Sequence, residues 1–224
     1  MPSGDQPANE QQHEITRSPE SARQFELELK RMIQGRNNHP CIVMWIPFNQ
    51  GWGQYDTVRI TGLVRQLDPS RLVAGVTGWY DMGGGDVRSL HAYPGPAKPE
   101  YDGMRACVEG ECGALGRPIQ GHMWGGAGRW GTVYFPSRQR FYDAYFEFIG
   151  KLSTLKAENG LAGAVFFQFN DVETDLNGFA TYDRAVIKMP VDTVRMLSEE
   201  LIKDDGKAPA SNKDSRPAPT KEAP

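Results

Sequence analysis

The stretch NNHPCIVMWIPFNQGWGQ, residues 37–54, decides the fold class. It opens with Asn-Asn-His-Pro, a sequence that stops a helix, and passes into a continuous apolar run at residues 41–48. A short apolar run of this kind is typical of a strand that is buried on both faces, as in a parallel sheet. The polar residues Asn49 and Gln50 follow it directly. The stretch therefore predicts a buried strand whose carboxyl end presents polar side chains.

A helix is predicted on each side of this strand. Ser18 and Pro19 give an N-cap followed by proline at the first helical position, and apolar residues then recur at helical spacing as far as Ile33. After the strand, Asp56 is a candidate N-cap for a second helix, which carries apolar residues on one face between positions 60 and 67. The pattern is helix, strand, helix.

The same alternation continues along the chain. Further strands are predicted at residues 72–76, 87–92, 105–111 and 164–169, and further helices at residues 141–155 and 191–201. Alternating strands and helices predict parallel βα units, here with about five strands. Two architectures fit this count: an open doubly wound sheet, and part of an eight-stranded barrel. The sequence has no GxGxxG after a strand and no GKS or GKT, so it offers no phosphate loop.

Polar and aromatic residues gather just past the predicted strand ends. They are Asn49, Gln50, Trp79, Asp81, His91, Tyr93, Glu109, Glu111, Gln168, Asn170, Asp171 and Glu173. A (β/α)₈ barrel builds its active site from residues in such positions. The alternative explanation is that strands end in loops, and loops are polar in any fold.

The composition limits the classes of partner. The chain has 224 residues, with 25 Lys and Arg against 28 Asp and Glu, and a net charge of −3 argues against nucleic acid and anionic membranes as main partners. No apolar run approaches the roughly 20 residues that span a bilayer, and residues 1–14 lack the apolar stretch of a signal peptide, which leaves the location open. The three cysteines (Cys41, Cys107 and Cys112) predict no disulfide framework and no metal site, and we expect buried thiols.

Four motifs carry a family resemblance. They are residues 37–54, quoted above, HAYPGP at 91–96, VEGECGALG at 108–116 and DVETDLNGFATYDRAVIK at 171–188. In this order the sequence resembles the C-terminal catalytic barrel of glycoside hydrolase family 2, the β-galactosidase and β-glucuronidase family, over roughly residues 2–203. The resemblance implies an α/β fold that is a partial (β/α)₈ TIM barrel, with strands 4 to 8 and their helices present and strands 1 to 3 missing.

The resemblance also implies a retaining hydrolase of O-glycosyl bonds in β-glycosides. Such a site uses one carboxylate as nucleophile and one carboxyl as general acid/base, about 5–5.5 Å apart. Glu111, in GECG at residues 110–113, matches the family's nucleophile, although Cys112 stands where an aromatic residue is usual. Glu109 is the alternative, and two residues earlier on one strand it is expected to face the same way. The motif, rather than geometry, favours Glu111.

The acid/base position departs from the family pattern. Asn49 matches the Asn of the family's Asn-Glu pair, which binds the sugar 2-hydroxyl, but the next residue is Gln50. An amide donates a hydrogen bond but neither delivers nor takes a proton, and general acid–base help is worth about 10²–10⁴-fold. We therefore expect impaired turnover, less so for aryl glycosides with good leaving groups. The exception would be a substitute carboxyl, for which Asp81, Asp171 and Glu173 are candidates.

Further substrate-binding candidates follow from the resemblance. His91 and Tyr93 match a strand-6 HxY motif and are candidates for binding the nucleophile or the sugar, with a core histidine as the alternative for His91. The remaining candidates are Trp52, Trp79, Gln168 and Asp171, the last of which could instead bind loop backbone. Trp45 is expected in the core, whereas Trp124 and Trp130 lie in a glycine-rich loop long enough to reach the site. No cofactor and no metal is implied.

The chain is expected to have three segments. Residues 1–17 form an irregular N-terminal segment, residues 18–204 a partial TIM-barrel glycosidase catalytic domain, and residues 205–224 a disordered tail rich in Pro, Ala and Lys. A complete barrel takes about 250 residues. The missing strands have three explanations: a misassigned start codon, a decaying gene, or a second chain that supplies them.

A carbohydrate is the expected partner, and the motifs do not define which sugar it is. Two other functions stay open. The chain could be a non-catalytic carbohydrate-binding pseudoenzyme, or an incomplete fragment of a longer glycosidase.

Overall fold

The computed structural model describes residues 14–125 and 132–203, and its centre is a five-stranded parallel sheet. The strand order is β2 (Phe48–Asn49), β4 (Val76–Gly78), β5 (Val87–Ala92), β6 (Ala106–Gly113) and β9 (Leu161–Phe167). Neighbours in the sheet follow one another along the chain, as the strands of a barrel do. The predicted α/β fold and partial TIM barrel are confirmed.

Two short parallel pairs form separate two-stranded sheets. β1 (Met44–Trp45) pairs with β3 (Leu72–Val73), and β7 (Leu115–Gly116) pairs with β8 (Val133–Tyr134). The strand predicted at residues 41–48 is therefore split into β1 and β2, with Pro47 between them, because proline cannot donate a ladder hydrogen bond. The strand predicted at residues 87–92 is found with the same bounds.

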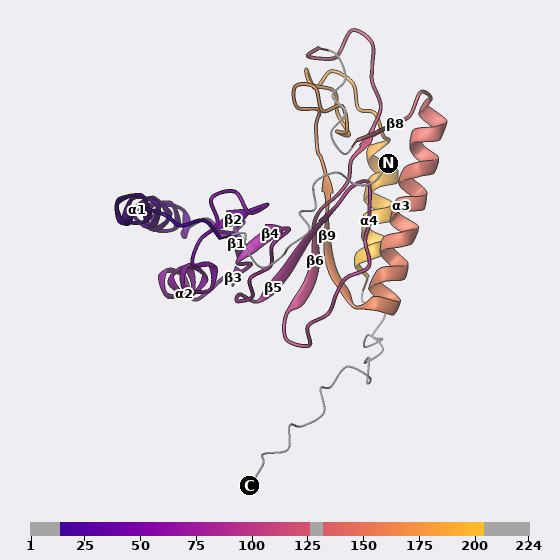
Figure 1. Ribbon diagram of the computed structural model, residues 1–224. Helices are drawn as coiled ribbons and strands as arrows, with labels where there is room; N and C mark the ends of the chain where they lie inside the picture. The colour runs from indigo at the N-terminus through magenta and orange to yellow at the C-terminus, as the bar shows by residue number, and fades with distance from the viewer. Residues whose placement is uncertain (1–13, 126–131, 204–224) are drawn as a thin grey trace.

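Four helices cover the two ends of the sheet and leave its middle to loops. α1 (Pro19–Arg36) and α2 (Thr57–Leu67) lie at one end, and α3 (Arg138–Asn159) and α4 (Val191–Ile202) at the other (Figure 1). In the described part of the chain, no helix joins β4 to β5 or β5 to β6, so the predicted alternation is incomplete. Three consecutive glycines at 83–85 and three prolines within 93–105 disfavour a helix in these connections.

The first end of the sheet has its own apolar core. Ser18 caps α1 by accepting a hydrogen bond from the Ser21 N–H (3.2 Å), as predicted. Apolar residues of α1, α2 and β1 to β4 then pack together, with Phe25 stacked on Phe48 at 5.4 Å between ring centroids. Asp56 precedes α2 as predicted but does not cap it, because its carboxylate binds Arg59 instead.

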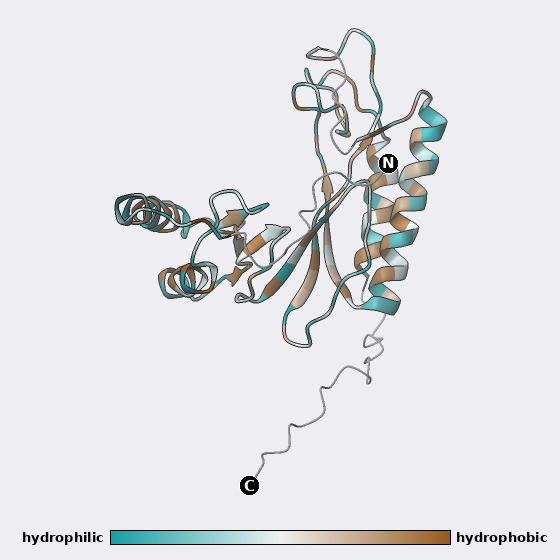
Figure 2. Ribbon diagram, viewed as in Figure 1, coloured by the Kyte–Doolittle hydropathy of each residue, from teal (hydrophilic) through white to brown (hydrophobic). Residues whose placement is uncertain are grey.

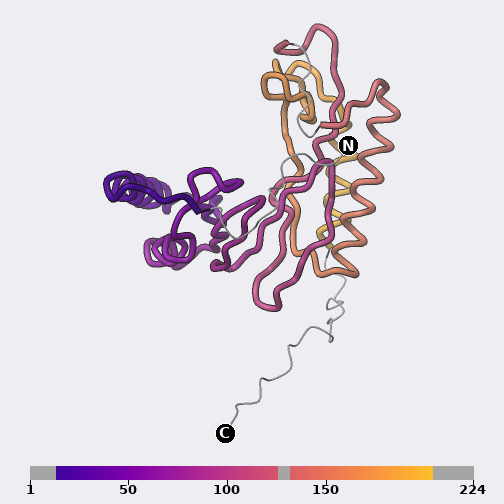
Figure 3. Tube along the Cα trace, viewed as in Figure 1, coloured from indigo at the N-terminus to yellow at the C-terminus, as the bar shows by residue number. Residues whose placement is uncertain are grey.

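A second apolar core holds the other end of the sheet. α3 and α4 pack there over β6, β7 and β9, and Phe166 stacks on Phe179 at 4.5 Å. Polar and apolar bands alternate along these helices, as expected for helices with one buried side (Figure 2). The loops that follow β7 and β9 lie beyond the carboxyl ends of β6 and β9 (Figure 3).

The exposure of the three cysteines differs from the expectation at one position. Cys107 and Cys112 are buried, but Cys41 is exposed, so the expectation of three buried thiols is wrong for Cys41 because it precedes β1 rather than lying within a strand.

In the described part of the chain, β2 and β9 each pair on one side only within the main sheet. No helix within the described ranges is long and apolar enough to cross a membrane.

Candidate active site

Side chains from four neighbouring strands meet around His91. The His91 Nδ1 atom lies 3.1 Å from Gln50 Nε2 and 3.7 Å from Glu111 Oε2, and its Nε2 atom lies 2.7 Å from Thr77 Oγ1. Gln50 follows β2, whereas Thr77, His91 and Glu111 belong to β4, β5 and β6. These parallel strands bring their carboxyl ends to one edge of the sheet, which is why residues 61 positions apart share one imidazole.

Tyr93 completes the cluster by holding Glu111. Its hydroxyl donates a hydrogen bond to Glu111 Oε2 and lies 3.5 Å from His91 Nδ1. Burial and the neighbouring Glu111 carboxylate raise the pKa of Tyr93, so the hydroxyl keeps its proton. Burial also raises the pKa of Glu111, an effect that the Tyr93 hydrogen bond opposes. The Glu111 side chain keeps 24% of its surface exposed, so it is within reach of a ligand.

His91 is a neutral imidazole in this setting. Its side chain is fully buried, and burial lowers the pKa of His91 to about 4. Thr77 Oγ1 also lies 2.6 Å from Ser89 Oγ, so two hydroxyls support the Nε2 side of the ring. A Cβ at Gly110 would come within 2.5 Å of Thr77 Oγ1, and glycine therefore lets β6 approach these hydroxyls.

Gln50 is placed by its backbone. It has a φ of 54°, and its N–H donates to the Thr77 carbonyl at 2.7 Å. Gly78 leaves room for the side chain, because a Cβ there would lie 3.1 Å from both Gln50 Cγ and His91 Nδ1. The residue predicted at the acid/base position and the predicted nucleophile thus contact the same histidine.

Glu109 has different surroundings from Glu111. Its Oε1 atom accepts a hydrogen bond from the Ala97 N–H at 2.7 Å, and its Oε2 atom has no partner among the described residues. β6 pairs with β5 through Leu90 opposite Glu109 and His91 opposite Glu111, so Gly110 is an extra residue at a register shift. Such a bulge interrupts the alternation on which the expected common direction of the two carboxylates depended.

The exposed candidates flank the cluster. Trp79 is half-buried, with its ring 6.1 Å from the His91 ring in an edge-on arrangement. Trp52 is 81% exposed on the loop after β2, and Asn49 at the end of β2 is also exposed. Trp45 is buried, as expected for a core residue, and donates to Asp68 Oδ2 at 2.8 Å. Trp130 lies outside the described residues.

Gln168 and Asp171 are tied into the loop after β9. The Gln168 amide donates to Asn177 Oδ1 at 2.9 Å. Asp171 Oδ1 lies 2.5 Å from Lys188 Nζ and accepts from the Gly178 N–H at 2.9 Å, with the Asp171 and Lys188 side chains fully buried. These contacts favour loop anchoring, the alternative role of Asp171.

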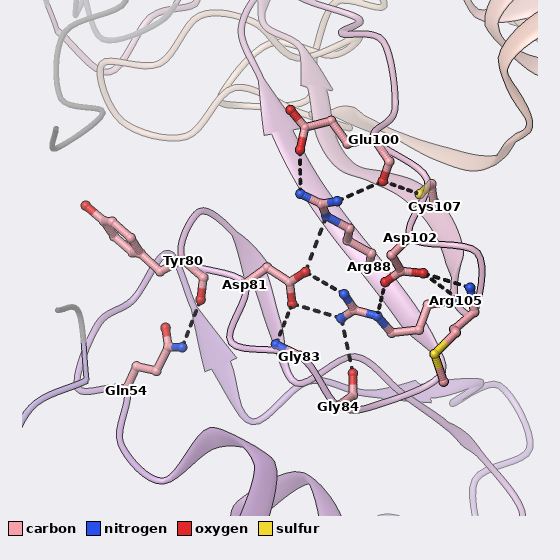
Figure 4. A network of polar contacts seen from close by, with 11 residues as sticks. Gln54, Tyr80, Asp81, Gly83, Gly84, Arg88, Glu100, Asp102, Arg105 and Cys107 are labelled. Carbon is pink, nitrogen blue, oxygen red and sulfur yellow. Dashed lines mark hydrogen bonds and ion pairs between the residues drawn. The ribbon is translucent and has the colours of Figure 1, made fainter. Parts of the chain in front are cut away.

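The other two candidates for a substitute carboxyl are Asp81, which is paired with arginines, and Glu173, which is exposed in a loop. Asp81 lies 2.6 Å from Arg105 and 3.3 Å from Arg88 (Figure 4). Burial by itself would raise the pKa of Asp81, but hydrogen bonds from Arg105 and from the Gly83 N–H outweigh it and lower the pKa. Glu173 is exposed in the loop after β9. No group of three metal-ligating side chains occurs within the described ranges.

Thr77, Ser89 and Gly110 are the site residues that sequence reasoning missed. Ser89 precedes His91 by two positions on a predicted strand and therefore shares its face, which is a signal that could have identified it. Thr77 gives no such signal, because its role depends on the pairing of β4 with β5.

Comparisons with known proteins concern the family and the fold of the chain. Residues 3–89 match the family model "Glycosyl hydrolases family 2, TIM barrel domain". Among solved structures, an FMN-binding beta-glucuronidase from Facaelibacterium prausnitzii L2-6 has a TM-score of 0.55 at 16% identity, covering 85% of this chain and 33% of that chain. Bacteroides uniformis beta-glucuronidase 2, covalently bound to cyclophellitol-6-carboxylate aziridine, has a TM-score of 0.53 at 15% identity, covering 86% and 27%.

A search of curated proteins found no match. The family model over residues 3–89 and the shared fold agree with the resemblance to the TIM-barrel domain of glycoside hydrolase family 2. The chain spans about a third or less of the length of these solved structures.

Proposed function

We propose that this chain carries the active-site half of a retaining glycosidase acting on β-glycosides, with Glu111 as the nucleophile and Gln50 at the acid/base position. One observation carries the proposal: Glu111 and Gln50 both approach His91 Nδ1, and Tyr93 donates to Glu111. Asn49, Trp52 and Trp79 flank this cluster and are proposed to contact the sugar or its aglycone. The substrate class is a carbohydrate.

In this mechanism Glu111 attacks the anomeric carbon. The bond to the leaving group breaks, and the leaving group takes the electron pair. Tyr93 orients the attacking carboxylate through its hydrogen bond. Gln50 can donate a hydrogen bond to the leaving oxygen but transfers no proton, so the step is slowed for alcohols and little affected for nitrophenols. The proposed activity is therefore impaired on ordinary O-glycosides.

The test measures labelling and leaving-group dependence. The chain is incubated with 2,4-dinitrophenyl 2-deoxy-2-fluoro-β-glycosides of galactose, glucose, glucuronic acid and mannose, and peptide mass spectrometry should find the sugar on Glu111. Gln50→Glu should then raise hydrolysis of an alkyl β-glycoside by about 10²-fold or more, and formation of the label much less. Failure of all four sugars to label Glu111 would contradict the proposal.

A carbohydrate-binding pseudoenzyme is the second candidate, and Gln50 is the observation that favours it. Sugar binding without chemistry should change the fluorescence of Trp52 or Trp79 while releasing no product. The same sugar panel, followed by tryptophan emission and by product analysis, separates the two functions.

We also propose that strands from outside the described residues complete the sheet. β2 and β9 pair on one side only, and apolar side chains are exposed at Val165 of β9 (55%), at Phe169 just after it (76%) and at Val43 just before β1 (69%). Exposed apolar patches of this kind mark surfaces that are normally covered. The isolated chain should therefore bind a hydrophobic dye at room temperature, and an absence of dye binding would count against this part of the proposal.

A further inference from the structure

Two loops that are far apart in the sequence hold an exposed pair of aromatic side chains. Trp124 belongs to the loop after β7 and Tyr182 to the loop after β9, and their ring centroids lie 4.9 Å apart with the rings tilted by 52°. Trp124 is 61% exposed and Tyr182 is 37% exposed. Single exposed apolar residues are common on protein surfaces, but here two separate loops bring two of them together. We call this pair the aromatic platform.

Polar contacts fasten the two loops beside the platform. His122 Nδ1, two residues before Trp124, lies 2.7 Å from the Oδ2 atom of Asp183, the residue after Tyr182. Asp183 Oδ1 accepts a hydrogen bond from the Thr181 hydroxyl at 2.7 Å. The hydrogen bonds from Thr181 and His122 lower the pKa of Asp183 to about 2, so it is a carboxylate at neutral pH. The turn that carries Tyr182 is thus fixed before any ligand arrives, which reduces the cost of ordering it on binding.

The platform lies at the same edge of the sheet as the candidate site. The Phe167 ring at the end of β9 lies 5.9 Å from the ring of Tyr93, which belongs to the cluster around His91. Asn170 follows three residues after Phe167 and pairs with Ala180, two residues before the platform tyrosine. Chain geometry therefore keeps the platform within about 25 Å of the end of β9. An oligosaccharide can span such a distance.

A sugar ring matches the chemistry of the platform. A pyranose has an apolar face of C–H groups and a rim of hydroxyls, and an aromatic surface bordered by a few polar groups complements both. The His122 and Asp183 side chains keep 34% and 45% of their surfaces exposed, so both are accessible to sugar hydroxyls. An apolar protein surface is a poorer match, because the platform is small and has polar side chains at its border.

We propose that Trp124 and Tyr182 form a subsite for a distal ring of an oligosaccharide whose terminal sugar occupies the site around Glu111. The inference rests on the proposed function and names its substrate class, which is a β-linked oligosaccharide rather than a glycoside of a small alcohol. Contacts at the platform hold a long substrate and do not change in the reaction at Glu111. The platform should therefore strengthen the binding of long sugars and leave the reaction of short ones unaffected.

The experiment measures binding against sugar length with the unmodified chain. Calorimetric titrations use cello-, manno-, galacto- and hyaluronan oligosaccharides, each as a disaccharide and a hexasaccharide. We expect the hexasaccharide of one series to bind about tenfold more tightly than its disaccharide. Trp124→Ala should remove this gain, leave the Kd of the disaccharide within about twofold, and be partly rescued by Trp124→Phe. Tyr101→Ala is the matched control, because Tyr101 is 62% exposed but lies in the loop before the amino end of β6.

A second measurement separates sugar binding from a purely structural role. The 2-fluoro glycoside should label Glu111 at the same rate in Trp124→Ala as in the unmodified chain. If Trp124→Ala slows labelling, or weakens both sugar lengths equally, the pair only fastens the loops and the inference is wrong. If Glu111 is labelled but no series binds more tightly with length, the inference is wrong and the proposed function stands. If Glu111 is not labelled but Trp124 still provides length-dependent binding, the proposed function fails and the platform remains a carbohydrate-binding site.

Discussion

The two faces of β5 and β6 are built by different interactions. On one face, Thr77 joins Ser89 and His91 by hydroxyl and imidazole hydrogen bonds, and Gly110 lies against these hydroxyls. On the other, Arg88 and Glu109 contact the loop at residues 93–105. One strand pair thus separates a candidate catalytic cluster from a loop held by charge.

The charged face takes the place of a covering helix. Arg88 donates to the carbonyl and the carboxylate of Glu100, and Arg105 binds both Asp81 and Asp102 (Figure 4). Helices cover the ends of the sheet by burying apolar side chains, whereas here ion pairs fix a loop. The comparison teaches that the middle of the sheet, directly behind the candidate site, depends on electrostatic rather than apolar contacts.

The largest expected effect separates the two carboxylates of β6. Glu111→Gln should lower nitrophenol release from a 4-nitrophenyl β-glycoside by on the order of 10³-fold, because it removes the attacking oxygen. Glu109→Gln is the matched control and should retain activity within about threefold, since Glu109 binds the Ala97 N–H and not the His91 cluster. Equal losses in the two variants would contradict the assignment of the nucleophile to one face.

The next prediction concerns the pH dependence of stability. Burial raises the pKa of Glu109 to about 7, an effect only partly offset by the Ala97 hydrogen bond, so the folded chain holds a proton that the unfolded chain has released. The free energy of unfolding should therefore fall by about 3 kcal/mol as the pH rises from about 4.5 to about 7, and this contribution should then level off. Urea unfolding across this range gives the slope.

Glu109→Gln supplies the control for that slope. The amide keeps the shape and an acceptor for Ala97, but it does not titrate. Subtracting its pH profile from that of the unmodified chain removes the contributions of other carboxyls, including Glu111. A difference that stays flat between pH 4.5 and 7 would show that Glu109 is not protonated in the folded chain.

The sequence predicts the strands of this fold better than it predicts what covers the middle of the sheet. The patterns at residues 41–48 and 87–92 place two strand regions, but the first strand is not buried on both faces as expected, because Val43 and Ile46 are exposed. The missing helices after β4 and β5 are a different matter. Periodicity finds helices that exist, but the replacement of a helix by an ion-paired loop depends on Arg88, Arg105 and their partners meeting in space.

The candidate site was predictable to a similar extent. Motif resemblance identifies Glu111, Gln50, His91 and Tyr93, and the structure brings these four together. The separation of Glu109 from Glu111 was not predictable, because a bulge at Gly110 changes the alternation and leaves no clear mark in the sequence. The strand-order contacts of Thr77 likewise require the paired sheet.

A smaller loss of stability should follow from breaking the ion pairs on the face of β5 and β6 that carries Arg88. Arg105→Met removes the cation shared by Asp81 and Asp102, two partners that are about a quarter exposed, and should lower the free energy of unfolding by about 2 kcal/mol. Lys151→Met breaks an exposed pair with Glu147 on α3 and should cost less than about 0.5 kcal/mol. Chemical unfolding of both variants compares them, and similar values would mean that the loop is not held by its ion pairs.

The smallest effect is expected on the face of the candidate site. Thr77→Val keeps the shape of the side chain but removes the hydroxyl between His91 Nε2 and Ser89 Oγ, which should cost about 1 kcal/mol of stability. The surface variant Thr154→Val, which loses a hydroxyl contact to its own helix, should change stability by a few tenths of a kcal/mol. If the hydroxyl also positions the imidazole, Thr77→Val should lower the rate of Glu111 labelling severalfold while Thr154→Val leaves it unchanged. A Thr77→Val variant that is destabilised but labels at the original rate would confine this hydroxyl to a structural role, and the two faces of the strand pair would then differ only in the kind of interaction that stabilises them.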